Sequence, residues 1–146
     1  MPVTTPRDFA EPRQAAQETA ALLTDLLGED DGVSPLSARG RRRIRIGRMM
    51  QAEARIDAAL ELIALQLPRW SLRRLAYDDG EWHCALSQRR ELPDWLDHCA
   101  EARHTDLALA ILHAAAEARR LEPTLPVSGE RSAEPVLATL LCCDNF

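Results

Sequence analysis

The stretch WSLRRLAYDDGEWHCALS, residues 70–87, decides the fold that we expect for this chain. Its two halves, residues 70–77 and 82–87, are rich in aromatic side chains or alternate between apolar and polar ones, which is typical of β-strands. Asp79 and Gly80 between them suit a two-residue type I′ turn, which needs positive φ angles at both central positions. The sequence therefore predicts a β-hairpin.

The turn also predicts which residues of the two strands lie opposite each other. The expected pairs are, on one face, Tyr77 with Trp82, Leu75 with Cys84 and Arg73 with Leu86 and, on the other, Asp78 with Glu81, Ala76 with His83 and Arg74 with Ala85. The first face is largely apolar. A two-stranded ribbon is not stable alone in water, so we expect this face, including Trp82, to be covered.

Helical patterns on both sides of the hairpin supply the expected cover. Upstream, a helix over residues 49–67 ends before Pro68; downstream, a well-buried helix has Thr105 as its cap and Asp106 in its first turn. The apolar positions at helical spacing are Ile56, Leu60, Ile63 and Leu67 upstream and Leu107, Leu109, Ile111, Leu112, Ala114, Ala118 and Leu121 downstream. We expect an α+β fold: a small antiparallel β-hairpin or sheet packed against two to four α-helices, with flexible N- and C-terminal segments.

Composition divides the chain into three parts. Residues 1–36 hold an N-terminal helix, over residues 11–27, and an acidic linker; residues 37–121 form a single α+β core domain; residues 122–146 form a flexible tail with an apolar C-terminal segment. We expect the N-terminal helix to pack against the domain, with contact to a partner chain as the alternative.

A further short helix is predicted over residues 93–100, because Pro93 suits a first helical position and Asp94 suits the first turn. Trp95 and Cys99 are four residues apart and would share a face. We expect them to close one end of the core.

The overall composition limits the class of protein. The 146 residues are 46% hydrophobic with a net charge of −5, which suits one core and excludes a protein that is basic throughout. The longest apolar runs are much shorter than the roughly 18 residues that a membrane-spanning helix needs, so we expect no membrane span. The N-terminal residues lack the pattern of a signal peptide, so we also expect no secretion. Four cysteines without a signal peptide then indicate reduced thiols in a cytoplasmic protein.

Residues 37–48 carry the strongest charge feature, with six arginines and no acidic residue. These are Arg39, Arg41, Arg42, Arg43, Arg45 and Arg48. Such a run fits phosphate-rich nucleic acid or an acidic protein surface, whereas the simpler interpretation is a solvated linker or the start of a helix. The simpler interpretation is favoured because no aromatic residue lies among the arginines to stack on bases, and Gly40 and Gly47 weaken a helix.

The sequence contains no catalytic, phosphate-binding or dinucleotide-binding motif, and we expect no cofactor. Two His-Cys dipeptides, beginning at His83 and His98, place their side chains in divergent directions, which disfavours a shared zinc ion. Cys84 and Cys99 are expected to be buried and inert. A small metal or redox protein that uses its histidines and cysteines, including the pair at 142–143, is therefore only the third functional hypothesis.

The order helix, Trp-initiated strand, Asp-Asp-Gly-Glu-Trp hairpin and Ala/Leu helix (LALAILHAAAEA, residues 107–118) resembles uncharacterised small proteins of GC-rich bacteria. More loosely, it resembles the phage ABA-sandwich domain. The resemblance covers residues 52–121 and implies a helix/sheet/helix sandwich without an assigned activity, so no functional residue follows from it.

These observations favour a non-enzymatic cytoplasmic accessory or regulatory protein that acts by binding another protein, with a homodimer as one arrangement and no membrane contact. The alternative is a nucleic-acid-binding module that uses the arginine run. Besides the six arginines, the candidate partner-binding residues are those of the apolar C-terminal segment, Val136, Leu137, Leu140, Leu141 and Phe146. A polar sheet face with Arg74, Asp78 and His83 is a further candidate surface.

Overall fold

The computed structural model describes residues 11–29, 32–89, 91–93 and 98–122. Their elements are α1 (Glu11–Leu27), α2 (Ala38–Gln51), α3 (Arg55–Gln66), β1 (Ser71–Asp78), β2 (Glu81–Ser87), β3 (Ala100–His104) and α4 (Leu107–Leu121). The strands form one antiparallel sheet in the order β1-β2-β3. The predicted α+β fold is confirmed.

The hairpin forms at the predicted turn, where Asp79 and Gly80 have φ angles of 50° and 83°. Five of the six predicted pairs are confirmed, namely Tyr77 with Trp82, Leu75 with Cys84, Asp78 with Glu81, Ala76 with His83 and Arg74 with Ala85. The sixth is wrong because the register shifts between Leu72 and Arg74, so that Leu72 opposes Leu86. This β-bulge places an apolar side chain, instead of that of Arg73, opposite the fully buried Leu86.

The third strand was not predicted. A helix was expected over residues 93–100, but Ala100 begins β3, where Ala100 pairs with Leu86 and Ala102 pairs with Cys84. Residues 94–97, with Trp95, lie outside the described residues. Alternation in AEARH, residues 100–104, is the signal for a strand, but alanine favours helices and the segment is short.

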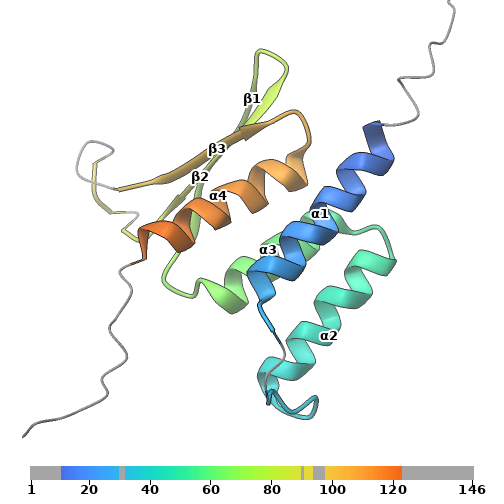
Figure 1. The fold of residues 1–146 in the computed structure, drawn as a ribbon. Coiled ribbons are helices and arrows are strands. Elements are labelled where there is room, and N and C mark those ends of the chain that lie inside the picture. Colours follow the sequence, from blue (N-terminus) through green and yellow to red (C-terminus); the bar gives the residue numbers. More distant parts are fainter. Residues whose placement is uncertain (1–10, 30–31, 90, 94–97, 123–146) are drawn as a thin grey trace, which may run out of the picture.

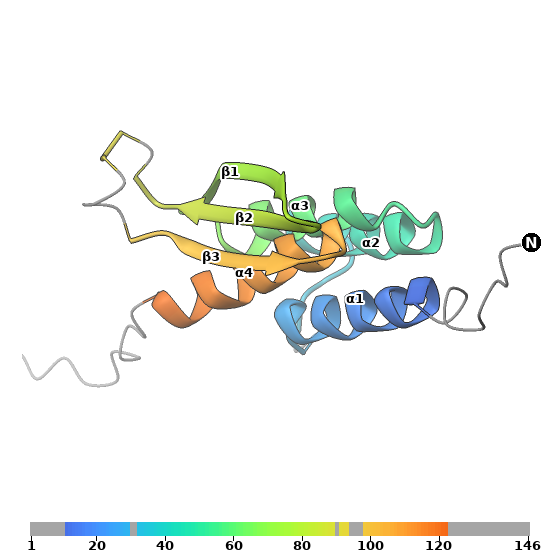
Figure 2. The same cartoon turned by 90° about the horizontal axis from the view of Figure 1, so that it is seen from above.

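Helix α4 packs against β2 and β3 on one side and against α1 and α3 on the other (Figures 1 and 2). Its cap is Asp106 and not Thr105: the Asp106 carboxylate accepts a hydrogen bond from the Leu109 N–H at 3.1 Å. Its buried residues are Ala108, Leu109, Ala110, Ile111, Leu112, Ala114, Ala115 and Ala118. This extent of burial confirms the prediction that the helix is well buried.

The segment before the hairpin forms two helices where one was expected over residues 49–67. The chain breaks between α2 and α3 at Glu53, which has a φ angle of 59°. The side of α3 that packs on the other helices carries Ala58, Ala59, Leu62 and Ile63. The predicted stripe is therefore wrong at Ile56 and Leu60, which are exposed, because small alanines let neighbouring helices approach closely and the larger side chains point elsewhere.

Helix α1 shares the common core, with Thr19, Leu23 and Leu26 buried. It packs against α3 and α4, as expected for the N-terminal helix.

Side chains from three other helices reach carbonyl groups at the end of α1. Arg43 of α2 donates to the Leu27 and Gly28 carbonyls at 2.8 and 3.0 Å. Gln66 of α3 also donates to Leu27, at 2.9 Å, and Arg119 of α4 donates to Asp25, at 3.2 Å. These bonds satisfy carbonyls that lack a partner within α1, and the two arginines place positive charge at the negative end of the helix dipole.

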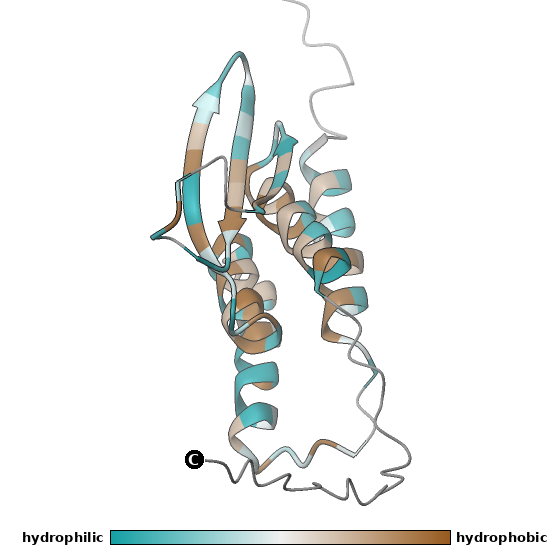
Figure 3. Cartoon of the chain, turned by 90° about the vertical axis from the view of Figure 1, so that its left-hand side faces the viewer, coloured by the Kyte–Doolittle hydropathy of each residue, from teal (hydrophilic) through white to brown (hydrophobic). Residues whose placement is uncertain are grey.

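In space, the sheet lies at one side of the molecule and α2 lies at the other, with α4, α3 and α1 between them (Figure 1). Figure 3 shows that the hairpin tip is hydrophilic, whereas hydrophobic positions gather where the strands meet the helices. None of the helices in the described residues is long and apolar enough to cross a membrane.

Candidate functional site

The arginine run forms α2, a complete helix that continues through both of its glycines. Of the two simpler interpretations, the solvated linker is therefore wrong, whereas the start of a helix in this segment is confirmed. Ser37 caps the helix by accepting a hydrogen bond from the Gly40 N–H at 3.0 Å. A Cβ atom at Gly40 would overlap the Ser34 carbonyl oxygen, so the absence of a side chain lets the helix start pack on the preceding turn.

Several arginines of α2 have structural partners. The Arg42 Nε atom lies 2.8 Å from a Glu61 carboxylate oxygen, and Arg39 donates to the Gln66 side-chain oxygen at 2.8 Å. Arg43 binds the end of α1, as described above. These contacts fix α2 on α3 and α1, so three of the six arginines have a role inside the molecule.

The other arginines share the outer face of α2. Arg41, Arg45 and Arg48 follow the spacing i, i+4, i+7 and are exposed, and Ile44, with 44% of its surface exposed, lies at the edge of this strip. Within the described residues, the side chains of Arg45 and Arg48 form no hydrogen bond or ion pair, and the Arg41 side chain donates a hydrogen bond to the Leu36 carbonyl. We call these four residues the basic face. About 10 Å separates its ends at 1.5 Å per residue.

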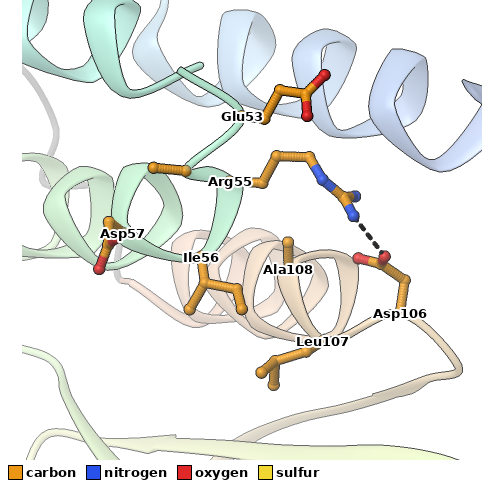
Figure 4. A pocket seen from close by; sticks show the side chains of 8 residues that line it. Glu53, Arg55, Ile56, Asp57, Asp106, Leu107 and Ala108 are labelled. Atoms are coloured by element: carbon orange, nitrogen blue, oxygen red, sulfur yellow. Dashed lines mark hydrogen bonds and ion pairs between the residues drawn. The ribbon is translucent and has the colours of Figure 1, made fainter. Parts of the chain in front are cut away.

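A polar cluster that the sequence did not reveal links α1, α3 and α4. An Arg55 guanidinium nitrogen lies 3.0 Å from a carboxylate oxygen of Asp106, and a second donates to the Thr19 hydroxyl at 3.3 Å (Figure 4). Two cavities border this ion pair: one of about 180 Å³, and one of about 500 Å³ that is also lined by Glu18 and His104. The cluster could not be predicted because its members are 36 and 51 residues apart.

Two histidines lie beside this cluster. The rings of His104 and His113 stack with their centroids 5.7 Å apart, and His104 Nδ1 accepts a hydrogen bond from the Asp106 N–H at 2.9 Å. His113 is exposed on α4, and partial desolvation there lowers its pKa from the ordinary value of 6.5; a positive charge on His104 lowers it further, and the Glu18 carboxylate opposes both effects.

The cysteines differ in exposure. Cys84 is buried as predicted, and burial raises the pKa of its thiol to about 11, which keeps it protonated at neutral pH. Cys99 was also expected to be buried but is only half-buried, because it lies just before β3 and not within a helix. Across the described residues, histidine, cysteine and carboxylate groups form no cluster of three that could hold a metal ion.

The apolar hairpin face is covered only in part, contrary to expectation. Tyr77 and Leu75 of β1 have 61% and 38% of their surface exposed, and Trp82 is half-buried with its ring centroid 5.0 Å from that of Tyr77. The reason is the position of α4, which packs under β2 and β3. Cys84 and Leu86 on β2 are therefore buried, whereas the outer part of β1 extends past the helix.

Two candidate binding surfaces remain, the apolar C-terminal segment and the polar face of the sheet. Val136, Leu137, Leu140, Leu141 and Phe146 of the C-terminal segment lie outside the described residues. On the polar sheet face, Arg74 and Asp78 are exposed and His83 is half-buried.

The fold and these surfaces define a small α+β protein with a three-stranded antiparallel sheet and an arginine-rich helix on the opposite side of the molecule. No family model, no curated protein and no solved structure matches the chain.

Proposed function

We propose that this chain is a non-enzymatic accessory protein that binds an acidic, amphipathic segment of another protein through the basic face of α2. The observation that carries the proposal is the position of Ile44, an exposed apolar side chain at the edge of the strip formed by Arg41, Arg45 and Arg48. Arginines next to an exposed apolar side chain are a common composition of protein interfaces, in which arginine is enriched and lysine is depleted.

The electrostatics support the same class of partner. Helix α2 carries six of the 18 arginines and no acidic residue, while the whole chain has a net charge of −5, so positive charge is concentrated on this helix. A partner helix with carboxylates spaced like the arginines and a leucine opposite Ile44 would complement both features. The guanidinium groups of Arg45 and Arg48 bind no described residue, so partner binding does not break contacts that they make within this part of the fold.

The second candidate function is nucleic-acid binding by the same face. The three outward arginines lie on a regular helix and not on a linker, so their charges keep a fixed spacing that suits contact with phosphates. This regularity favours nucleic-acid binding. The exposed Ile44 has no counterpart in phosphate recognition, which is why an acidic protein segment is the better fit.

The proposal is tested with the double variant Arg45→Glu/Arg48→Glu and the control Arg74→Glu/Arg103→Glu, which makes the same charge change at two exposed positions of the sheet. The probe is a labelled helical peptide with glutamates at i, i+4 and i+7 around one leucine, and fluorescence anisotropy measures its binding to the full chain. We expect the α2 variant to lose at least about tenfold in affinity, equivalent to ~1.4 kcal/mol, and the control to retain binding.

A peptide of the same composition in scrambled order controls for charge alone. Equal binding of both peptides, or an equal loss in both double variants, would contradict the proposal. A gel shift with duplex DNA separates the second candidate: binding through about three phosphates should weaken with salt at a logarithmic slope of roughly −2.7. If the α2 variant loses only DNA binding, the second candidate replaces the first.

A further inference from the structure

A second surface of this molecule is apolar and only partly covered. It comprises Leu75 and Tyr77 of β1 with Ile56 and Leu60 of α3, the last two 42% and 38% exposed. We call it the β1–α3 face. Figures 1 and 3 place α3 below the β1–β2 hairpin, and in Figure 4 the side chains of Ile56 and Leu107 point together toward the strands.

The spacing of these residues places each pair on one side of its own element. Ile56 and Leu60 are four residues apart and so share a side of α3, distinct from the side where Ala58, Ala59 and Leu62 are buried. Leu75 and Tyr77 are two residues apart on β1 and share the inner side of the sheet with the buried Cys84, which pairs with Leu75. Tyr77, with 61% of its surface exposed, and the three aliphatic side chains are the kind of apolar surface that an apolar segment would bury.

We infer that the apolar C-terminal segment of the same chain, residues 136–146, covers the β1–α3 face. Its first eight residues, VLATLLCC, contain no charge and match the chemistry of the face. The 13 residues that separate Glu122 from this segment can span up to about 45 Å when extended. Helix α4 is about 22 Å long at 1.5 Å per residue, so the segment can return along it to Leu107, which lies beside Ile56.

The tether favours this occupant over a second copy of the chain. A short linker holds an attached segment at an effective concentration of the order of millimolar, far above the concentration of separate molecules in dilute solution. The inference uses a different surface from the basic face of α2, and neither proposal depends on the other.

Cross-linking tests the inference in the full chain. The background is Cys99→Ser, which leaves the buried Cys84 and the native Cys142 and Cys143 of the segment. Ile56→Cys adds a thiol on the face, and Glu101→Cys adds one at an exposed position of β3 on the other side of the sheet. With a short bismaleimide, we expect Ile56→Cys to form a link within one chain to Cys142 or Cys143, identified by peptide mass, and Glu101→Cys not to form it.

A second measurement compares the full chain with a chain that ends at Pro135. The thiol introduced by Ile56→Cys should react with a monofunctional maleimide at least about fivefold more slowly in the full chain, because the attached segment shields it. The thiol introduced by Glu101→Cys should react equally in both chains. Equal rates at Ile56→Cys, or no link within one chain, would overturn the inference. Links between chains that increase with protein concentration would overturn it in favour of a second copy as the occupant.

Discussion

At the scale of single residues, Asp106 shows how one side chain joins several parts of the fold. One carboxylate oxygen caps α4 through the Leu109 N–H, and the other pairs with Arg55, which also reaches Thr19 on α1. The Asp106 N–H donates to His104 and so helps to hold the imidazole that stacks on His113. The titration of His113 is thereby linked to the junction of three helices.

Lowering the pH should destabilise the fold through His113. The pKa of His113 in the folded protein lies below the ordinary value of 6.5, so the unfolded chain takes up a proton more readily than the native state does. Its contribution to stability is complete above pH 6.5 and is lost as the pH falls through the lower, folded pKa. We expect the urea midpoint to fall between pH 7.5 and 5.5, and to fall less in His113→Gln.

The exposed His98 provides the control, because His98→Gln should retain the pH dependence of the natural chain. Titration of the His113 ring proton by NMR measures the pKa directly. A value for His113 above that of an unfolded peptide would show that the neighbouring Glu18 carboxylate outweighs burial and His104, and that the sign of the effect is reversed.

At the scale of elements, α2 shows that identical residue types can have opposite roles within one helix. Gly40 and Gly47 both lower helix propensity in an isolated peptide. In the folded protein, Gly40 is buried against the turn at Ser34, whereas Gly47 is exposed with no atom near the position of a Cβ. Only Gly40 is therefore required by packing.

Alanine at the two glycines should change stability in opposite directions. Gly47→Ala should stabilise the protein by about 0.5–1 kcal/mol, since alanine has the higher helix propensity and meets no neighbour. Gly40→Ala should destabilise it by roughly 1–3 kcal/mol, because the added methyl group meets the backbone of residues 34 and 35. Urea unfolding followed by far-UV circular dichroism measures both effects, and two changes of the same sign would contradict the placement of α2.

At the scale of the whole molecule, α1 belongs to the same packed body as the strands. Its carbonyl end is satisfied by side chains of α2, α3 and α4, and Leu23 and Leu26 lie in the common core. The basic face and the β1–α3 face are thus presented by a single unit.

Leu23→Ala should accordingly destabilise the entire fold. Removing this side chain, which is 3% exposed, should cost about 2–5 kcal/mol and lower the midpoint of one shared transition. Tryptophan fluorescence, whose signal comes from Trp70 and Trp82 around the sheet and from Trp95, and circular dichroism, which reports on the helices, should give coincident curves. Leu36→Ala, at an exposed position, should change stability by less than about 0.5 kcal/mol. Two separate transitions would show that α1 unfolds alone.

The sequence by itself determined the parts of this fold that depend on neighbouring residues. The Asp79-Gly80 turn specified the hairpin and most of its register, and the apolar spacing after Asp106 specified α4, because backbone preference and side-chain period act over a few residues. Only the tertiary structure decided that residues 100–104 form a strand, since alanine favours helices in isolation and pairing with β2 supplies the hydrogen bonds that overrule this preference.

Tertiary structure also decided which arginines are free to bind. All six are equivalent in the sequence, but Arg43 lies at the end of α1 and Arg42 beside Glu61, whereas Arg45 and Arg48 point outward. The same holds for Tyr77 and Cys84, which share a face of the hairpin but differ in burial because α4 lies under β2. Partners of this kind come from segments far apart in the chain, and the spacing of residues within one element carries no information about them.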